Sequence, residues 1–376
     1  MKMFKRFCFA ALMALCLVFG GCAAQPQPET GEKGRPIDAA FVARAVDEAL
    51  AVMIEENFDA YAWYLTAEEY QRMQEDIEGS FGGIGVYMNI LPGEEYPLIV
   101  SVMSGQPAEK AGVLAGDRII AVDRQDVAGQ GTEAVSAKVR GEKGTVVTLL
   151  LLGEDGKERE VRITRQEIQA VSVTGREIPG HPNIAYIAIS SFTYNTPGEF
   201  RDVFEKMTRE RQIDALIIDL RNNPGGSLSA CLDIASLFVP KNGTLITMKT
   251  ANGPVSEKSG GGRKITIPVV CLQNGGSASA SEVLTGALLD HGIAVSVGEK
   301  SYGKGITQQV VPLKNKRALR YTNSKYLTPS GFSLHGVGLS PTYEVVLNPG
   351  VGLADIEKAD PAVDNQLAKA IEVLFK

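Results

Sequence analysis

Residues 267–282 read Ile-Pro-Val-Val-Cys-Leu-Gln-Asn-Gly-Gly-Ser-Ala-Ser-Ala-Ser-Glu, and an apolar helical pattern follows as far as Leu289. An apolar strand therefore leads through two glycines and alternating serines into a helix. Turns of this kind present the nucleophile in many hydrolases. A second interpretation stays open, because Ser279 followed by Glu282 also fits a capping box at a helix start. At least two of the three serines are expected to be structural.

A candidate base follows twenty-five residues after Ser279, where Lys304 lies between Gly303 and Gly305. A serine hydroxyl needs a neighbouring base, and lysine can serve once a dry, apolar site lowers its pKa. Serine with lysine is a known variant of the catalytic triad. Asp290 lies about 16 Å further along a helix that rises 1.5 Å per residue, so we expect it at the helix end, away from the chemistry.

A candidate oxyanion site follows another apolar run. Residues 213–220 are followed by Arg-Asn-Asn-Pro-Gly-Gly. Two glycines after a buried strand let backbone N–H groups approach a ligand closely. Gly225 or Gly226, together with the N–H of Ala280, would then bind the oxyanion. A tight turn before the next helix is the structural alternative.

These motifs, in their order and spacing, resemble the carboxy-terminal processing peptidases, also called tail-specific proteases. The matching segments are residues 66–70, 81–86, 115–120, 140–145, 219–226, 277–282 and 298–308. The resemblance covers nearly all of the chain after residue 37. It implies that Ser279 is the nucleophile, that Lys304 is the base and that Gln308 orients the lysine. It also implies a crotonase-like ββα spiral for the protease core.

The remainder of the chain predicts an α/β multidomain protein. Apolar strands alternate with helices in the core, which is typical of α/β folds. Short alternating strands separated by glycine-rich turns predict a β-rich module, which the resemblance identifies as a PDZ domain. The expected segments are a helical one at 37–79, the PDZ domain at 80–165, the protease core at 166–350 and a C-terminal helical one at 351–376.

Two local expectations concern the later part of the chain. Residues 250–263 are rich in Gly and Ser, and we expect a loop there. Asp360 as the cap and Pro361 at the first helical position predict the start of a closing helix.

The PDZ module contains a candidate peptide-binding loop and a candidate gating residue. The loop consists of Gly82, Gly83, Ile84, Gly85 and Val86. Its backbone N–H groups can converge on a C-terminal carboxylate while the peptide adds as a strand. Arg140, at the end of a predicted helix, could reach the protease domain and report that the groove is filled. A solvated turn charge is the alternative for Arg140.

The N-terminus resembles a bacterial lipoprotein signal. Three basic residues precede an apolar run at 7–19, and Gly-Gly-Cys22 follows. The run is too short to span a bilayer. The pattern predicts a signal peptide at 1–22, lipidation of Cys22 and a flexible tether at 23–36. Plain cleavage and release is the alternative. We expect an extracytoplasmic, lipid-anchored protein, in the periplasm or at the outer cell surface.

Composition excludes several classes of protein. Of the 376 residues, 44% are apolar and 22% charged, as in ordinary globular proteins. Loss of residues 1–21 removes three of 38 basic residues, and the remaining 35 against 44 acidic ones argue against a nucleic-acid partner. No set of residues has metal-ligand spacing, so neither a metal nor a cofactor is expected. Cys231 and Cys271, both in apolar runs, are expected to be buried thiols.

We therefore predict a serine endopeptidase that captures C-termini or unfolded tails in its PDZ domain and cleaves through an acyl-enzyme. The expected partners are proteins or peptides with free C-termini, the membrane through Cys22, and a second copy of the chain or a regulatory adaptor. A catalytically silent PDZ scaffold that binds peptide tails is the alternative. The joint presence of Ser279, Lys304 and Gln308 argues against it, because a binding module has no use for all three.

Overall fold

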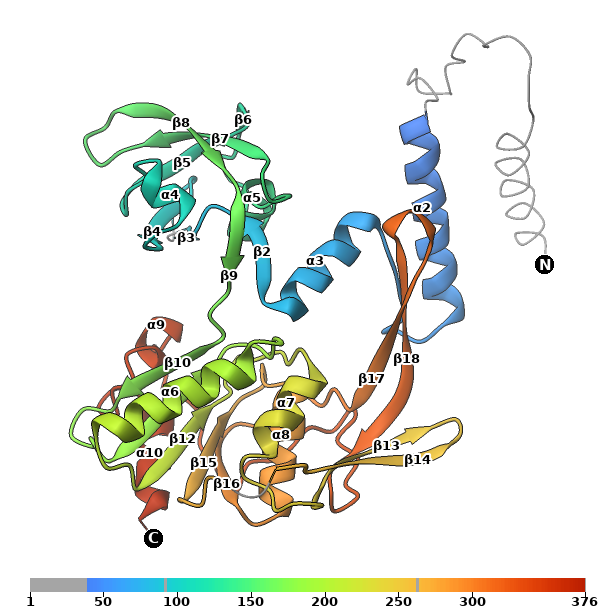
Figure 1. Ribbon diagram of the computed structural model, residues 1–376, viewed down its shortest axis with the longest axis vertical. Coiled ribbons are helices and arrows are strands. Elements are labelled where there is room, and N and C mark those ends of the chain that lie inside the picture. Colours follow the sequence, from blue (N-terminus) through green and yellow to red (C-terminus); the bar gives the residue numbers. More distant parts are fainter. Residues whose placement is uncertain (1–38, 91–92, 262–263, 376) are drawn as a thin grey trace. The chain divides into compact units, whose positions relative to one another are not determined.

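The computed structural model describes residues 39–90, 93–261 and 264–375 (Figure 1). The chain forms two compact units, one of residues up to Gln71 with Gln308–Asn323, the other of Arg72–Thr307 with Ser324–Lys376. None of the helices in these described ranges combines the length and apolar character that crossing a membrane requires. The predicted signal peptide, Cys22 and the tether lie outside the described residues.

The first unit packs a long helix beside the tip of a β-ribbon. It contains α2 (Ala39–Asn57) and β1 (Trp63–Leu65), and it takes in parts of α3 (Ala67–Glu78), β17 (Ile306–Pro312) and β18 (Ala318–Leu327). β1 pairs antiparallel with β18. Asp47 of α2 pairs with Arg317 at 2.9 Å and accepts a hydrogen bond from the Tyr64 hydroxyl at 3.0 Å. These polar contacts hold α2 against the ribbon.

The β-rich module has its own apolar core. Its main sheet has the order β3 (Val86–Asn89), β4 (Leu98–Val102), β5 (Arg118–Val122), β7 (Val146–Leu152) and β8 (Glu158–Thr164), with β6 (Gln125–Asp126) beside β5. Two helices, α4 (Pro107–Lys110) and α5 (Thr132–Val139), accompany the sheet. A separate pair joins β2 (Ser80–Gly83) to β9 (Gln166–Gln169). In β7 every second side chain is buried, as expected when one face of a sheet covers a core.

The α/β core is built on a six-stranded sheet. Its order is β10 (Val173–Glu177), β11 (Ile184–Ile189), β12 (Ala215–Asp219), β15 (Val269–Gln273), β16 (Ala294–Gly298) and β19 (Tyr343–Glu344). The strands from β11 to β19 are parallel, and only β10, at one edge, runs antiparallel. Every residue of β12 and β15 is buried, which is typical of a parallel sheet covered on both faces.

Helices cover both faces of this sheet (Figure 1). Leu216 and Ile218 of β12 pack with α6 (Thr196–Glu210), α7 (Leu228–Ala235) and α8 (Ala280–Asp290). Ile217, which points the other way, packs with α10 (Asn365–Leu374), the last helix described. Because parallel strands end at the same edge, the loops after β12, β15 and β16 meet there. These loops carry the motifs singled out in the sequence.

The loop expected at 250–263 is wrong for Thr250 and for residues 253–258, which are strand. β13 (Thr244–Thr250) and β14 (Gly253–Lys258) form an antiparallel hairpin, and β13 also pairs with β18. The Thr250 hydroxyl closes the turn by donating to the Gly253 carbonyl at 2.8 Å. β14 is largely exposed, so it needs no apolar alternation, and its polar composition resembles that of a loop.

The start of the C-terminal helix was also predicted wrongly. Asp364, not Asp360, caps α10, because its carboxylate accepts from the N–H groups of Gln366 and Leu367, both at 3.0 Å. Asp360 accepts from the Ala362 N–H at 2.9 Å within the preceding turn. The two aspartates make similar local contacts, but only Asp364 is fully buried.

Candidate active site

Asn223 joins the loop after β12 to the turn before α8. Its side chain is fully buried, donates to the Ile189 carbonyl at 2.8 Å and accepts from the Gly225 N–H at 2.9 Å. Its backbone carbonyl accepts from the Ala278 N–H at 3.0 Å and from the Ser281 hydroxyl at 2.9 Å. The two loops are therefore held as one body.

The three alternating serines have different surroundings. The Ser277 hydroxyl donates to the Leu220 carbonyl at 2.8 Å and accepts from the Asn274 N–H at 2.9 Å. The Ser281 hydroxyl is bound to Asn223, and both serines are buried. Ser279 lies between them and is partly exposed. Ser277 and Ser281 are thus structural, and Ser279 is the member of the trio that can meet a ligand.

Ser279 has an unusual backbone. Its φ is 55° and its ψ is −115°, and it stands at the N-cap of α8. A positive φ in a residue with a side chain costs on the order of 1–2 kcal/mol, and such strain gathers at functional sites. The Ser279 N–H donates to Glu282 at 2.9 Å, so the capping interaction expected from the sequence is present too. Ser279 begins a helix in a geometry that an ordinary cap does not require.

The two candidate oxyanion glycines have different neighbours. A β-carbon placed on Gly225 would lie 2.8 Å from the Ser279 β-carbon and 3.0 Å from the Ala280 nitrogen. Gly226 instead lies against Phe192, whose carbonyl oxygen would be 2.2 Å from such a β-carbon. Both glycines have positive φ, at 103° and 134°. The structure therefore brings Gly225 beside Ser279 and Ala280, although the Gly225 N–H donates to Asn223 here.

Glu282 connects the start of α8 to the segment that carries Lys304. Its side chain is 1% exposed. Oε2 accepts from the backbone N–H groups of Ser279 at 2.9 Å and Lys304 at 2.8 Å. Oε1 accepts from the Ser301 hydroxyl at 2.5 Å and the Gly303 N–H at 2.7 Å. The sequence predicts the capping contact of Glu282 with Ser279 but not its contacts with residues 301–304. A carboxylate inside an apolar helix is nevertheless a signal for a buried partner.

The glycines beside Lys304 allow a close backbone contact. A β-carbon on Gly303 would lie 2.8 Å from the Gly338 nitrogen, and one on Gly305 would lie 2.6 Å from the His335 nitrogen. The Gly303 carbonyl accepts from the Gly336 N–H at 2.8 Å. The Gly-Lys-Gly segment is therefore packed against the 334–338 turn, and its position depends on having no side chains on either side of Lys304.

Tyr326 contacts both candidate residues and was missed by sequence reasoning. Its hydroxyl donates to the carbonyl of Lys304 and lies 3.2 Å from the carbonyl of Ser279. Its own N–H donates to the Gly305 carbonyl at 3.1 Å. Burial raises the pKa of Tyr326, and the charge of Glu282 raises it further, so the hydroxyl keeps its proton. No motif in the sequence marked this tyrosine.

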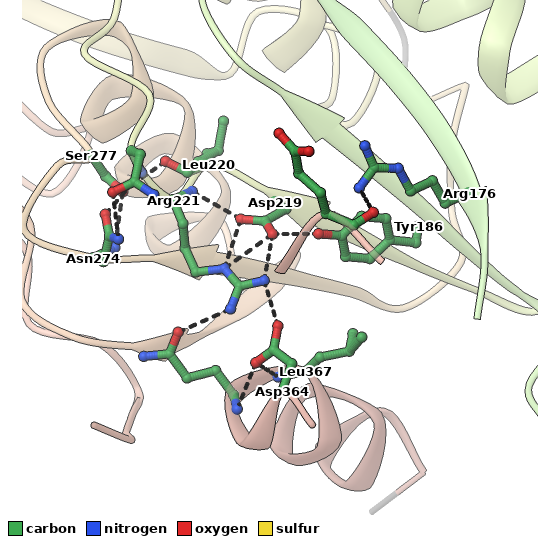
Figure 2. A network of polar contacts seen from close by, with 12 residues as sticks. Arg176, Tyr186, Asp219, Leu220, Arg221, Asn274, Ser277, Asp364 and Leu367 are labelled. Carbon is green, nitrogen blue, oxygen red and sulfur yellow. Dashed lines mark hydrogen bonds and ion pairs between the residues drawn. The ribbon is translucent and has the colours of Figure 1, made fainter. Parts of the chain in front are cut away.

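A buried ionic network surrounds Arg221, which follows β12 directly (Figure 2). The Arg221 guanidinium pairs with Asp219 at 2.6 Å and with Asp364 at 2.8 Å. The Tyr186 hydroxyl donates to Asp219 at 2.5 Å, and burial raises the pKa of this tyrosine. Gln366 accepts from Arg221 at 3.1 Å. The network fixes the end of β12, where the Asn223 loop begins, and ties it to α10.

Gln308 belongs to the first unit and has a partner there. Its side-chain nitrogen donates to the Tyr61 carbonyl at 2.6 Å. This contact fixes the Gln308 amide, and its predicted role in orienting Lys304 stays a prediction.

The predicted peptide-binding loop, residues 82–86, runs from the end of β2 to the first residue of β3. Three of its carbonyls accept backbone hydrogen bonds within the module. The Gly82 carbonyl accepts from the Gly141 N–H at 3.0 Å, the Ile84 carbonyl from the Ala108 N–H at 2.8 Å and the Gly85 carbonyl from the Met103 N–H at 2.9 Å. Ile84 is buried in the core of the module, and Val86 is only partly buried. β3, which starts at Val86, is the end strand of its sheet. An end strand can accept a further strand, as β-augmentation requires.

Arg140 follows α5 and contacts the end of α3. Its guanidinium lies 3.9 Å from the centre of the Phe81 ring, and one of its nitrogens lies 3.8 Å from an Asp76 oxygen. The side chain is therefore packed on one face, which is more than a solvated turn charge requires.

Comparison with known proteins gives the same assignment over most of the chain. Residues 183–345 match Peptidase family S41, and residues 98–152 match a PDZ domain. A carboxyl-terminal-processing protease of Synechocystis is 35% identical over 334 residues, which are 88% of this chain and 76% of that protein. A CtpA-like serine protease of Staphylococcus haemolyticus is 35% identical over 302 residues, or 80% of this chain.

The chain spans 60% of the length of the Staphylococcus haemolyticus relative. A solved structure attributed to an S41 protease of Bacteroides fragilis superposes with a TM-score of 0.51 at 17% identity, covering 93% of this chain and 92% of the other. That likeness concerns the fold alone.

Proposed function

Because the chain belongs to peptidase family S41, a family of serine-type peptidases that includes the carboxyl-terminal-processing proteases, we propose that it cleaves proteins with a Ser279–Lys304 dyad. The observation that carries the proposal is the strained backbone of Ser279 at a helix start, joined through Glu282 to the backbone of Lys304. A scaffold that only binds peptides has no use for strain at this serine.

The proposed reaction is acyl transfer. Neutral Lys304 takes the hydroxyl proton of Ser279 as the oxygen attacks the substrate carbonyl, and it then gives that proton to the departing amine. Water attacks the resulting acyl-enzyme while Lys304 takes a proton from it, and the ester bond breaks as Lys304 returns that proton to the Ser279 oxygen. The backbone N–H groups of Ala280 and of Gly225 or Gly226 would bind the oxyanion. Gln308 would orient the lysine.

We propose that the PDZ module selects substrates by their C-terminal tails. The end strand β3 and the adjoining loop at Gly82–Gly85 support this proposal, since a tail can add to the strand while its carboxylate meets backbone N–H groups. Charge-assisted hydrogen bonds are about twice as strong as neutral ones. Amidating the C-terminus of a peptide should therefore weaken its binding to the Ser279→Ala protein about tenfold or more. Equal affinity of the two peptides would contradict the proposal of tail recognition, and the proposal of a Ser279–Lys304 dyad would still stand.

We also propose that the protein acts outside the cytoplasm as a lipoprotein anchored at Cys22. The support is the order of basic, apolar and small residues before this cysteine. Cys22→Ala should release the protein from the membrane fraction of the cells that make it. Unchanged fractionation would argue for a different location.

The deciding test is cleavage by the purified protein. An unfolded protein is incubated with the wild-type chain and with Ser279→Ala, and new termini are mapped by mass spectrometry. New termini with the wild type alone are expected. Equal cleavage by both would mean a contaminating protease. No cleavage by either, with tail peptides still bound, would favour the scaffold alternative.

A further inference from the structure

Tyr326 occupies a position that completes a set of backbone contacts around the two candidate catalytic residues. Glu282 accepts from the N–H groups of both Ser279 and Lys304. The Tyr326 hydroxyl lies within hydrogen-bond distance of the carbonyl oxygens of the same two residues. Two buried side chains thus hold the peptide groups of both, whichever rotamers the serine and the lysine adopt.

The arrangement is asymmetric, and the asymmetry indicates what Tyr326 does. One hydroxyl carries one proton, so it donates to one of the two carbonyls at a time. The Tyr326 N–H holds the Gly305 carbonyl as well, so this single residue binds two consecutive carbonyls of the Gly-Lys-Gly segment. Tyr326 therefore anchors chiefly the lysine side of the site.

The strand that carries Tyr326 is itself fixed. Tyr326 faces Met248 in the pairing of β18 with β13, and its ring, 2% exposed, belongs to the main apolar core. A hydroxyl on so rigid a support helps to define the distance between two loops that are also joined through Glu282 and through the hydrogen bond from the Tyr302 N–H to the Ser277 carbonyl at 3.0 Å. Reacting groups need such precision, because a misplacement of about 1 Å can cost about a hundredfold in rate.

We propose that Tyr326 is a positioning residue that sets the separation of Ser279 and Lys304, an inference that rests on the proposed Ser–Lys chemistry. Its hydroxyl contacts the Ser279 side chain as well as the two backbone carbonyls, so it holds the proposed nucleophile in place. Its removal should lower the rate of proton transfer between serine and lysine without changing how a peptide tail is captured.

The test uses Tyr326→Phe, which keeps the ring and removes the hydroxyl. We expect kcat to fall about 10- to 100-fold while KM stays within about twofold. The second-order rate of Ser279 labelling by a fluorophosphonate should fall by a similar factor, because that reaction also needs the activated serine. Ser296→Ala is the matched control, since it removes a buried hydroxyl of β16, in the six-stranded sheet, that accepts from the Thr342 N–H. The control should keep kcat within about twofold.

The outcomes separate this inference from the proposed function. A wild-type protein that neither cleaves nor reacts at Ser279 would sink both. An active wild type with an equally active Tyr326→Phe variant would overturn the positioning role alone. Replacing Tyr326 by 4-aminophenylalanine restores a hydrogen-bond donor and should recover most of kcat. The melting temperature of this variant should be close to that of Tyr326→Phe, so that a change in stability does not explain the recovery. Failure to recover would mean that the lost hydrogen bond is not the cause.

Discussion

The carboxylate of Glu282 accepts a hydrogen bond from the backbone N–H of Lys304 at 2.8 Å, although twenty-two residues separate them in the sequence. The same oxygen accepts from Ser279, and the second oxygen accepts two further donors. All four contacts use the acceptor capacity of an ionised carboxylate. The capping glutamate therefore links the two halves of the site.

This link predicts the effect of Glu282→Gln. An amide offers one acceptor oxygen, so its NH2 group would face at least one backbone N–H donor whichever way it is turned. Hydrogen bonds to charged groups contribute about 1.5–3 kcal/mol each, so we expect unfolding to become easier by about 2–4 kcal/mol and kcat to fall at least tenfold. Urea unfolding and steady-state cleavage measure the two effects. Wild-type kcat in a folded Glu282→Gln protein would contradict the link.

Substitution of each of the three serines should show whether that serine contributes to activity or to stability. Ser279→Ala is expected to abolish cleavage and leave the fold intact, and combining it with Lys304→Ala should add nothing, because the pair acts as a unit. Ser277→Ala leaves the Leu220 carbonyl without its hydroxyl donor and should cost about 1–3 kcal/mol of stability while the folded fraction stays active. Ser281→Ala should behave in the same way. Complete inactivity of folded Ser277→Ala would move the nucleophile to that residue.

The buried network at Arg221 predicts a stability effect from the far end of the chain. Asp364→Asn keeps a residue that caps helices well but removes one charge facing Arg221, so we expect a loss of about 1.5–3 kcal/mol in urea unfolding. Lys358→Ala is the control, because its pair with Asp355 is largely exposed and should contribute less than about 1 kcal/mol. Equal effects of the two variants would show that the network is not stabilising.

The contact of Arg140 with Phe81 and Asp76 bears on gating. If the side chain reports a filled groove, Arg140→Ala should slow cleavage of long substrates several-fold and leave tail affinity unchanged. Lys143→Ala removes an exposed charge nearby in the sequence, paired with Glu167, and should change neither. Titration of a tail peptide and cleavage of an unfolded protein give the two readouts. Unchanged cleavage by Arg140→Ala would leave the residue with a packing role only.

The Asp47–Arg317 pair makes the first unit sensitive to acid. The hydrogen bond from Arg317 is the main cause that lowers the pKa of Asp47 below its usual 3.8. A carboxylate with a lowered pKa in the folded state stabilises above its unfolded value and loses that contribution as pH falls through the lowered one. Asp47→Asn should therefore reduce thermal stability at pH 6 by about 1 kcal/mol or less and have no effect near pH 2. Equal losses at both pH values would contradict an ionic origin.

The sequence predicts those parts of the candidate site that have a local pattern in the chain. The serine trio, the double glycine after β12 and the glycine-flanked lysine stood out because strand, turn and helix signals surround them. Tyr326 could not be found in this way. Its role depends on β18 pairing with β13 and on the Lys304 segment lying beside it, and both are long-range contacts without a local signature.

The errors have physical causes as well. The β13–β14 hairpin resembles a loop in its sequence, because an exposed ribbon tolerates the Gly and Ser content that is typical of loops. Asp360 and Asp364 each accept local N–H groups, so only the buried partner of Asp364, Arg221, distinguishes the true cap. The network around Arg221 joins β12 to α10, and no pattern within either segment indicates the other.

The positive φ of Ser279 brings the stability of the fold and the proposed reactivity into conflict at one position. Glycine is the residue that such a backbone suits best, and glycine has no hydroxyl. Ser279→Gly would therefore relieve backbone strain and remove the proposed nucleophile in a single change.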